Sequence, residues 1–344
     1  MMKKILFLAL LSFALTGAAQ TRNVLFIGNS YTEVNDLPML IRQAAQSAGC
    51  DITYQRNTPG GCTFQQHCGN ASMDFIRQGG WDVVVLQEQS QLPSFPQNQV
   101  EAEVFPYARQ LVNAVRAYND SCTPMFYMTW GRRDGDQMNA SEFPVLGTYW
   151  GMDSMLYERY MQMKRDNVAA VCPVGRVWRY LRTYYPQLEL YDGDGSHPSM
   201  MGSYTAACAF FVMLFGQPAA NITFDATLEP STAALIRRVT DSVAYDHLEQ
   251  WRMVDTAAID TTAPSEEGIL SVADVPMRIY PNPATHHVTV VSPSAEVCFL
   301  YDIFGRRRAT FTLVAGSNQV MLAHLEPGVY FLRCKGKGYK ITKE

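Results

Sequence analysis

The sequence has few charged residues and no long hydrophobic run beyond its first residues. Charged side chains make up 17% of the 344 residues, whereas 47% are hydrophobic and 12% aromatic. These proportions are typical of a globular protein with a full core, not of a disordered chain. No later stretch reaches the roughly 20 apolar residues that span a bilayer, and the run 206–215 suits a buried helix. We expect no transmembrane segment in the mature chain.

The sequence also lacks clustered basic residues. The chain has 28 Lys and Arg residues, of which nine lie from Asp274 on, and 32 Asp and Glu residues, of which five lie there. Setting aside Lys3 and Lys4, the stretch between carries the remaining 17 basic and 27 acidic residues. Nucleic acids and anionic membranes are bound by clustered Lys and Arg. We therefore expect neither as a partner.

The cysteines lack the spacing of a metal site. Cys62 and Cys68 have no second pair nearby, as a zinc knuckle would require, so we expect no bound metal. In an exported protein some of the eight cysteines are expected to pair, but too many pairings exist for the sequence to choose among them. Cys298 and Cys334 pair only if strands bring them together.

The chain begins with the pattern of a secretory signal peptide. Two lysines precede the apolar run 5–15, and small residues lead to Ala19, after which we expect cleavage. The residue directly after this point is Gln20 and not a cysteine, so a lipid anchor is not expected. The domains predicted are then a signal peptide (1–19), a main domain (20–254), a linker (255–274) and a C-terminal domain (275–344).

In the main domain apolar strands alternate with amphipathic helices. We predict strands at 23–27, 52–55, 81–86, 124–130 and 169–172. Helices are predicted between Pro38 and Gly49 and at 104–118, 154–166, 174–184 and 198–215. Strands that are apolar on both faces indicate a parallel sheet covered on both sides, with its site at the carboxyl ends of the strands. After the polar, aperiodic linker, short alternating runs at 277–280, 287–291, 297–302, 319–322 and 329–334 predict a small β-sandwich.

Polar motifs follow these strands. Ser30 comes directly after the first strand, near the positive end of the next helix, which favours a developing oxyanion. His197 lies in a glycine-rich loop three residues after Asp194, close enough for the carboxylate to orient the imidazole. Asp192 is a second candidate for this acid. Each motif alone also fits an ordinary turn or helix cap.

Two further segments join this set. The pair Gly60-Gly61 lets backbone N–H groups approach a ligand closely, although an ordinary turn has the same residues. Gln87 and Gln89 leave the third strand with amides that can donate to an oxyanion or merely face solvent. His67, near the glycine pair, either lines the pocket or is a surface residue.

Together the motifs resemble the blocks of SGNH (GDSL-like) hydrolases over roughly 23–216. Gly28-Asn29-Ser30 is similar to the family's first block, usually Gly-Asp-Ser, and Asp194-Gly-Ser-His197 to its last. The resemblance implies an α/β fold, the flavodoxin-like three-layer α/β/α SGNH hydrolase domain. It implies Ser30 as nucleophile, His197 as base and Asp194 as its partner.

The oxyanion hole implied by the resemblance consists of Ser30, Gly61 and Gln89. Gly61 matches the family glycine whose N–H completes the hole, and Gln89 stands where an Asn is usual. Gln is one methylene longer, so Gln87 or the backbone donors would carry more of the hole. Losing one such donor typically costs about 100–1,000-fold in rate.

Four residues near these motifs are candidates for substrate binding: Asn29, Gln87, Glu88 and Trp130. Glu88 either supports the site from behind or is a solvated surface residue, and the latter is favoured. Trp130 is expected with Tyr149 and Trp150 either at the rim, where rings stack on sugars, or in the core.

The last segment, from 275, resembles the C-terminal sorting domain of type IX secretion. The resemblance rests on Tyr-Pro-Asn-Pro after Ile279, Tyr-Asp-Ile-Phe-Gly after Val297-Cys-Phe-Leu300, and Glu-Pro-Gly-Val-Tyr after Leu325. It implies passage through the type IX machinery, and a secreted or cell-surface protein of a bacterium. A generic accessory β-sandwich is the alternative.

The function expected is a serine esterase acting on an acyl ester, O-acetyl above all, of a small molecule or an extracellular glycan. A Ser-His-Asp triad needs no cofactor, so none is expected. One alternative is a catalytically silent carbohydrate-binding surface protein on the same fold, favoured by the change to Gln89. Another is a lipase or thioesterase for longer acyl chains.

Overall fold

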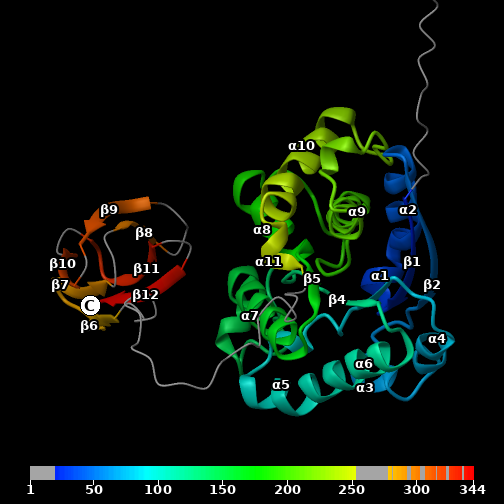
Figure 1. Ribbon diagram of the computed structural model, residues 1–344, viewed down its shortest axis with the longest axis horizontal. Helices are drawn as coiled ribbons and strands as arrows, with labels where there is room; N and C mark the ends of the chain where they lie inside the picture. Colours follow the sequence, from blue (N-terminus) through cyan, green and yellow to red (C-terminus); the bar gives the residue numbers. More distant parts are fainter. Residues whose placement is uncertain are drawn as a thin grey trace, which may run out of the picture. The chain divides into compact units, whose positions relative to one another are not determined.

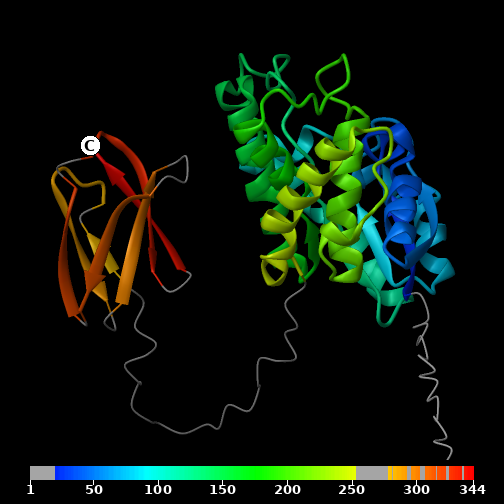
Figure 2. The same cartoon turned by 90° about the horizontal axis from the view of Figure 1, so that it is seen from above.

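The protein is described from a computed structural model of residues 1–344, and the residues described are 20–252 and most of 278–344 (Figures 1 and 2). Within the second range the gaps are 281, 293–295, 303–306, 315, 323–324 and 335–336. The chain divides between Ile259 and Asp260 into two compact units, each considered by itself below. The expected signal peptide, 1–19, and linker, 255–274, lie outside the described residues.

Five parallel strands form the sheet of the first unit, in the order β2-β1-β3-β4-β5. They are β1 (Gln20–Ile27), β2 (Cys50–Asn57), β3 (Val83–Leu86), β4 (Thr123–Tyr127) and β5 (Ala170–Cys172). All residues of β3 and β5 are buried, as expected for a sheet covered on both faces. The chain leaves β1 for β2 on one side and then crosses to β3 on the other. A ligand site is expected where this direction changes, outside the carboxyl ends of β1 and β3.

Helices cover both faces of this sheet (Figure 1). Helix α6 packs with α4 and α7 on one face, and α9 packs with α2 and α8 on the other. The α-helices are α1 (Ser30–Glu33), α2 (Leu37–Ser47), α3 (Phe64–His67), α4 (Ser72–Gln78), α5 (Gln97–Glu103), α6 (Phe105–Tyr118), α7 (Tyr149–Asn167), α8 (Val174–Tyr184), α9 (Met200–Phe215), α10 (Pro230–Thr240) and α11 (Leu248–Trp251). The shorter 3-10 or π segments are η1 (Val34–Asp36), η2 (Leu92–Ser94), η3 (Pro144–Gly147), η4 (Ala219–Asn221) and η5 (Asp241–Tyr245). The expected three-layer α/β/α fold is confirmed.

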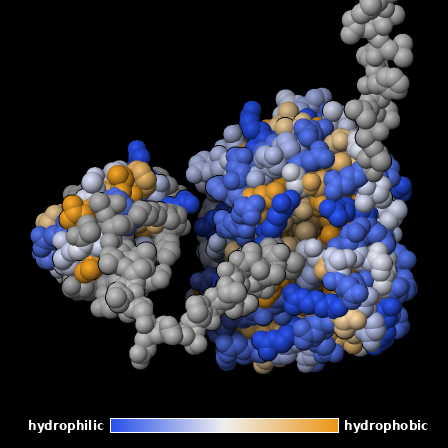
Figure 3. All heavy atoms as spheres, viewed as in Figure 1, coloured by the Kyte–Doolittle hydropathy of each residue, from blue (hydrophilic) through white to orange (hydrophobic). Residues whose placement is uncertain are grey.

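Helix α9 explains the most apolar run of the mature chain. Every residue from Gly202 to Phe215 is buried, because the helix lies between the sheet and its neighbours α2, α8 and α10. In the part of the chain that the structure describes, no helix has both the length and the apolar character needed to cross a membrane. The visible surface of the unit is mostly hydrophilic, as Figure 3 shows.

The described strands of the second unit form two antiparallel sheets, β10-β7-β6 and β12-β11-β8-β9. They are β6 (Arg278–Tyr280), β7 (His287–Ser292), β8 (Glu296–Asp302), β9 (Arg307–Leu313), β10 (Gly316–Met321), β11 (Gly328–Cys334) and β12 (Lys337–Lys343). Val288, Leu300 and Leu332 are among the side chains of one common core. The expected all-β domain is confirmed. Edge strands β9 and β12 were not predicted, because their many polar residues obscure the alternation of strands.

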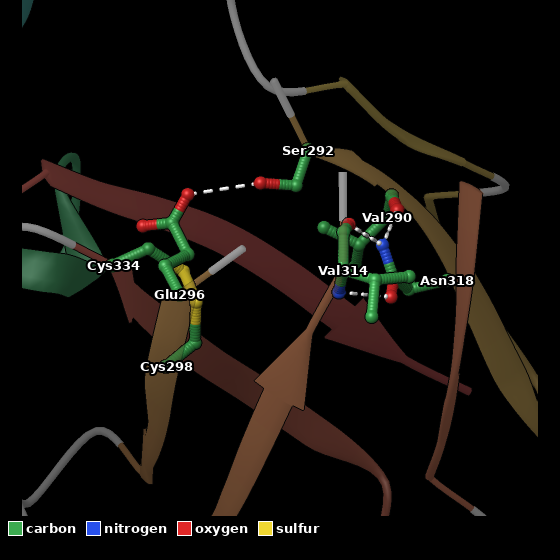
Figure 4. Close-up of a disulfide and its surroundings, with 7 residues drawn as sticks. All are labelled: Val290, Ser292, Glu296, Cys298, Val314, Asn318 and Cys334. Carbon is green, nitrogen blue, oxygen red and sulfur yellow. Dashed lines mark hydrogen bonds between the residues drawn. A yellow bond between two sulfur atoms is a disulfide. The ribbon is translucent and has the colours of Figure 1, made fainter. Parts of the chain in front are cut away.

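Cys298 and Cys334 form a disulfide across β8 and β11 (Figure 4). The register places them opposite each other with their Cα atoms 4.5 Å apart. Beside them Ser292 donates a hydrogen bond of 2.9 Å to Glu296. Glu296 and the two cysteines form the one group of metal-binding residue types found close together among the described residues. Because both sulfurs are oxidised, the group lacks the thiolates that such a site would use.

Candidate active site

Three side chains from two distant segments meet at the carboxyl end of the first unit's sheet. His197 Nε2 lies 2.9 Å from the Ser30 hydroxyl, and His197 Nδ1 lies 2.5 Å from Asp194 Oδ2. Ser30 and His197 are part-buried, whereas the side chain of Asp194 is 49% exposed. A serine, an imidazole and a carboxylate in this order can act as a nucleophile, its base and the acid that orients the base.

The loop that carries His197 is organised around Asp194. Asp194 Oδ1 accepts hydrogen bonds of 2.9 Å from the N–H groups of Ser196 and His197, which leaves Oδ2 for the imidazole. Burial alone would raise the pKa of Asp194, but hydrogen bonds from the His197 ring and the two N–H groups outweigh it and lower the pKa to about 2. Asp192, the second candidate, instead accepts from the N–H of Gly193.

A stack of aromatic rings packs against the loop that carries His197. Trp130 lies between Tyr31 and Trp178, with stacked rings at centroid distances of 4.8 and 3.7 Å. Trp130 Nε1 donates to Ser196 O, and the Tyr31 hydroxyl lies 2.7 Å from Ser196 Oγ. Trp130 is fully buried, which fits the core alternative rather than the rim, and its part in substrate binding stays a prediction. Its ring holds the histidine loop.

Two further residues hold the histidine segment, Asn35 from the serine segment and Arg133 from the segment after β4, and the sequence singled out neither. Asn35 Nδ2 donates to Pro198 O at 3.1 Å and to Ser203 Oγ at 3.0 Å. Arg133 N–H donates to Gly195 O at 2.8 Å. Side chains that cross between loops follow from tertiary folding, and no local pattern marks them.

The turn that presents Ser30 is fixed by two amides. Gln87 Oε1 accepts from Asn29 N–H and from Thr32 Oγ1, while Gln87 Nε2 donates to Asn29 Oδ1. Both amides are buried. Their part in substrate binding stays a prediction, and the contacts that the structure shows hold the serine turn. Gly28 allows this approach, since a Cβ there would lie 2.7 Å from both Gln87 Oε1 and Thr32 Oγ1. His67 is also buried beneath the turn, with Nε2 2.9 Å from Gly28 O.

The candidate oxyanion donors lie at the ends of three strands. Neither Ser30 N–H nor Gly61 N–H makes a hydrogen bond to another described residue, so both remain free to donate. Gly61 has φ +67°, a left-handed conformation that glycine adopts without strain. Gln89 Oε1 accepts from the N–H groups of Gln91 and Leu92, which leaves its amide nitrogen as the remaining donor.

Glu88 is not the solvated residue that was favoured. Its side chain is fully buried and accepts hydrogen bonds from the N–H groups of Phe64 and Gln89. The sequence interpretation was wrong because a polar residue that leaves a strand is taken to face solvent when the segments that cover it are unknown. Here the Gly61 loop and helix α3 cover the end of β3.

On the side of the Gly61 loop, the residues around the site are uncharged. A hollow of about 510 Å³ borders the Gly61 loop and is lined by Pro59, Gly60, Cys62, Gln65, Gln66, Gly69 and Asn70. Neither Ser30 nor His197 lines it. Trp150 is 46% exposed, whereas Tyr149 is buried beneath the Arg182 guanidinium. Of the three rings expected either at the rim or in the core, Trp130 and Tyr149 are buried and Trp150 is exposed.

Comparison with known proteins separates the two units. Residues 278–344 match the family described as the secretion system C-terminal sorting domain. The expected type IX sorting domain is therefore confirmed, and the protein is directed to the cell surface or the medium through the secretion machinery. No curated protein matches the chain.

The first unit resembles solved structures of low sequence identity. A DUF4886 family protein from Bacteroides uniformis is 17% identical over 68% of this chain and 98% of that chain, with a TM-score of 0.58. A protein from Slackia heliotrinireducens, provisionally assigned as an SGNH hydrolase, is 23% identical over 57% and 100%, with a TM-score of 0.47. A provisional GDSL-like lipase from Parabacteroides merdae is 12% identical over 58% and 98%, with a TM-score of 0.41. At 17% identity the first likeness shows a shared fold, so function is argued from the site.

Proposed function

We propose that the protein is a secreted serine ester hydrolase with Ser30 as nucleophile, His197 as base and Asp194 as the acid that orients the base. The observation that carries this proposal is the continuous chain of contacts from Ser30 Oγ through the His197 ring to Asp194. Segments far apart in sequence supply it, and a chance surface contact would not also bring free backbone donors to the same edge of the sheet.

In the proposed reaction Ser30 Oγ attacks the acyl carbon of the ester while His197 Nε2 takes the hydroxyl proton. The carbonyl oxygen becomes an oxyanion held by the N–H groups of Ser30 and Gly61 and by the Gln89 amide. The ester C–O bond then breaks and His197 returns the proton to the leaving alcohol. Water hydrolyses the acyl-serine by the same steps, which releases the carboxylic acid and restores Ser30.

The substrate class proposed is an O-acetyl or other short acyl ester, carried by an extracellular glycan or a small molecule. Export through the sorting domain supports an extracellular substrate. The hollow beside Gly61, whose lining includes Gln65, Gln66 and Asn70 and no charged side chain, fits a neutral sugar better than a charged one.

The test is hydrolysis of p-nitrophenyl acetate by the mature chain, beside Ser30→Ala and His197→Ala. We expect both variants to lose about 1,000-fold or more in kcat/KM, because each removes one member of a unit that acts together. Ser154→Ala on helix α7 is the matched control and should keep the parent rate.

The outcome distinguishes the alternatives. Equal rates for the parent and Ser30→Ala would overturn the mechanism. A parent inert towards all esters that still binds acetylated glycan would favour the silent carbohydrate-binding protein. A preference for long-chain over acetyl esters would favour the lipase or thioesterase.

A further inference from the structure

Glu88 is a fully buried carboxyl group at the centre of the candidate site's support. Oε1 accepts from Gln89 N–H at 2.6 Å and from Phe64 N–H at 3.0 Å, and Oε2 lies 3.2 Å from the same Phe64 nitrogen. Phe64 begins helix α3 directly after the Gly61 loop. One side chain therefore ties that loop to Gln89, so it links two of the three proposed oxyanion donors.

The backbone of Glu88 extends the same connection to the serine turn. Its carbonyl accepts from Gln87 Nε2 at 2.6 Å and from Asn29 Nδ2 at 3.5 Å. Asn29 Nδ2 also donates to Cys62 O at 3.0 Å. The ends of β1 and β3 and the Gly61 loop are thus joined within one hydrogen-bonded cluster. Of the residues named in this cluster, Glu88 is the one with a carboxyl group.

No cation balances a charge on Glu88 among the described residues. The titratable groups that face it are Cys62 of the Gly61 loop, Cys68 after α3 and Tyr160 of helix α7, all neutral when protonated. Burial raises the pKa of Glu88 to about 8, although the N–H groups of Gln89 and Phe64 oppose the rise. At neutral pH the carboxyl group therefore holds its proton.

We propose that Glu88 is a positioning residue that holds the Gly61 loop and Gln89 against Ser30, and that loss of its proton at alkaline pH slows the reaction. This inference rests on the proposed function. When the proton leaves for solvent, a negative charge is buried beside donors that must stabilise a second negative charge, the oxyanion. Two like charges in a site that excludes water repel strongly.

The same titration affects folding. In the unfolded chain a glutamate loses its proton near pH 4, whereas the folded protein retains it to about pH 8. The folded state therefore binds more protons in this window, and the free energy of unfolding falls as pH rises through it. The substitution Glu88→Gln puts a neutral side chain at this position and removes the dependence.

The experiment is kcat for p-nitrophenyl acetate from about pH 6 to 10 for the mature chain and Glu88→Gln, corrected for spontaneous hydrolysis. We expect the parent to lose about tenfold with a midpoint near pH 8, and Glu88→Gln to lose no more than about twofold over the same range. Near neutral pH the two should differ only a few-fold, since Gln matches the protonated acid in shape.

Asp241→Asn is the matched control. Asp241 also has a raised pKa from burial and accepts from two backbone N–H groups, those of Ala219 and Ala220, but belongs to no part of the site. It should show the parent's pH profile. A merely structural role of Glu88 would lower kcat at every pH and leave the midpoint unchanged, which would overturn the proposal, as would an unchanged profile in Glu88→Gln.

Infrared difference spectra provide a measurement that does not depend on activity. A protonated carboxyl band should disappear with a midpoint near pH 8 in the parent and in Ser30→Ala, and be missing from Glu88→Gln. If Ser30→Ala hydrolyses ester as fast as the parent, the proposed function fails, yet this band still decides whether Glu88 titrates. If Glu88→Gln does not fold, Glu88→Asp, with a shorter reach to Phe64, must move the midpoint.

Discussion

The first unit buries polar side chains at one end of its sheet, whereas the described part of the C-terminal unit buries mainly apolar side chains around a disulfide. Asn29, Gln87 and Glu88 are fully or nearly fully buried in the first unit. The core of the second contains residues such as Val288 and Leu332. Buried polar groups cost free energy unless they are paired, so their concentration at one sheet end coincides with the site proposed for the chemistry.

The cysteines follow the same division. Six cysteines of the first unit are free, and the two of the C-terminal unit form a disulfide. A small domain buries a smaller fraction of its surface than a large one and gains more from a cross-link. The large unit can therefore keep unpaired thiols in its core while the small one relies on a covalent bond.

The largest effect that should separate the two units is that of Asp194→Asn. The amide cannot hold the His197 ring in the same tautomer, so we expect kcat to fall about 1,000-fold. The lowered pKa of Asp194, about 2, means that its contact with His197 stabilises the fold fully above the ordinary pKa of an aspartate, near 4. This stabilisation is lost as pH falls through about 2. Steady-state kinetics measures the first effect.

The matched acid for this prediction is Asp192, which caps its own loop and does not contact the imidazole. Asp192→Asn should keep kcat within about threefold. Equal losses in both variants would mean that loop structure, and not the orientation of His197, carries the effect.

The second effect concerns the C-terminal unit alone. Removing the disulfide with Cys298→Ala and Cys334→Ala releases a loop whose ends are 36 residues apart, which should lower that unit's free energy of unfolding by about 3–4 kcal/mol. Denaturant unfolding followed by circular dichroism measures the loss. The ester hydrolysis rate should not change, nor should mild reduction of the parent change it, because the first unit has no disulfide among its described cysteines.

The smallest effect compares one glycine from each unit. Gly28→Ala brings a methyl group to 2.7 Å from Gln87 Oε1 and should displace the serine turn, with a loss of about 10–100-fold in kcat. Gly338→Ala in β12 meets no atom within 4 Å and should leave both kcat and stability near those of the parent. An active Gly28→Ala protein would show that the turn tolerates movement.

Much of the fold was predictable because it depends on local patterns. The apolar run that became β3 and the uninterrupted apolar stretch of α9 identify elements buried on all sides without any knowledge of their neighbours. Boundaries were less certain: the strand expected at 124–130 ends at Tyr127, since Trp130 has turned out of the sheet to stack on Trp178. Strand β12, rich in lysine, lacked the alternation that would have revealed it.

The sequence by itself determined which residue types stand at the ends of the strands: Ser30 after β1, Gln89 after β3, and Asp194 three residues before His197. Their chemistry and the geometry of parallel strands suffice to predict a hydrolase site. Only the tertiary structure decided that Asp194 rather than Asp192 reaches the imidazole, that Trp130 supports a loop, and that Glu88 is buried. Those outcomes depend on how segments far apart in the chain pack over one another, and burial arises only when that packing is complete.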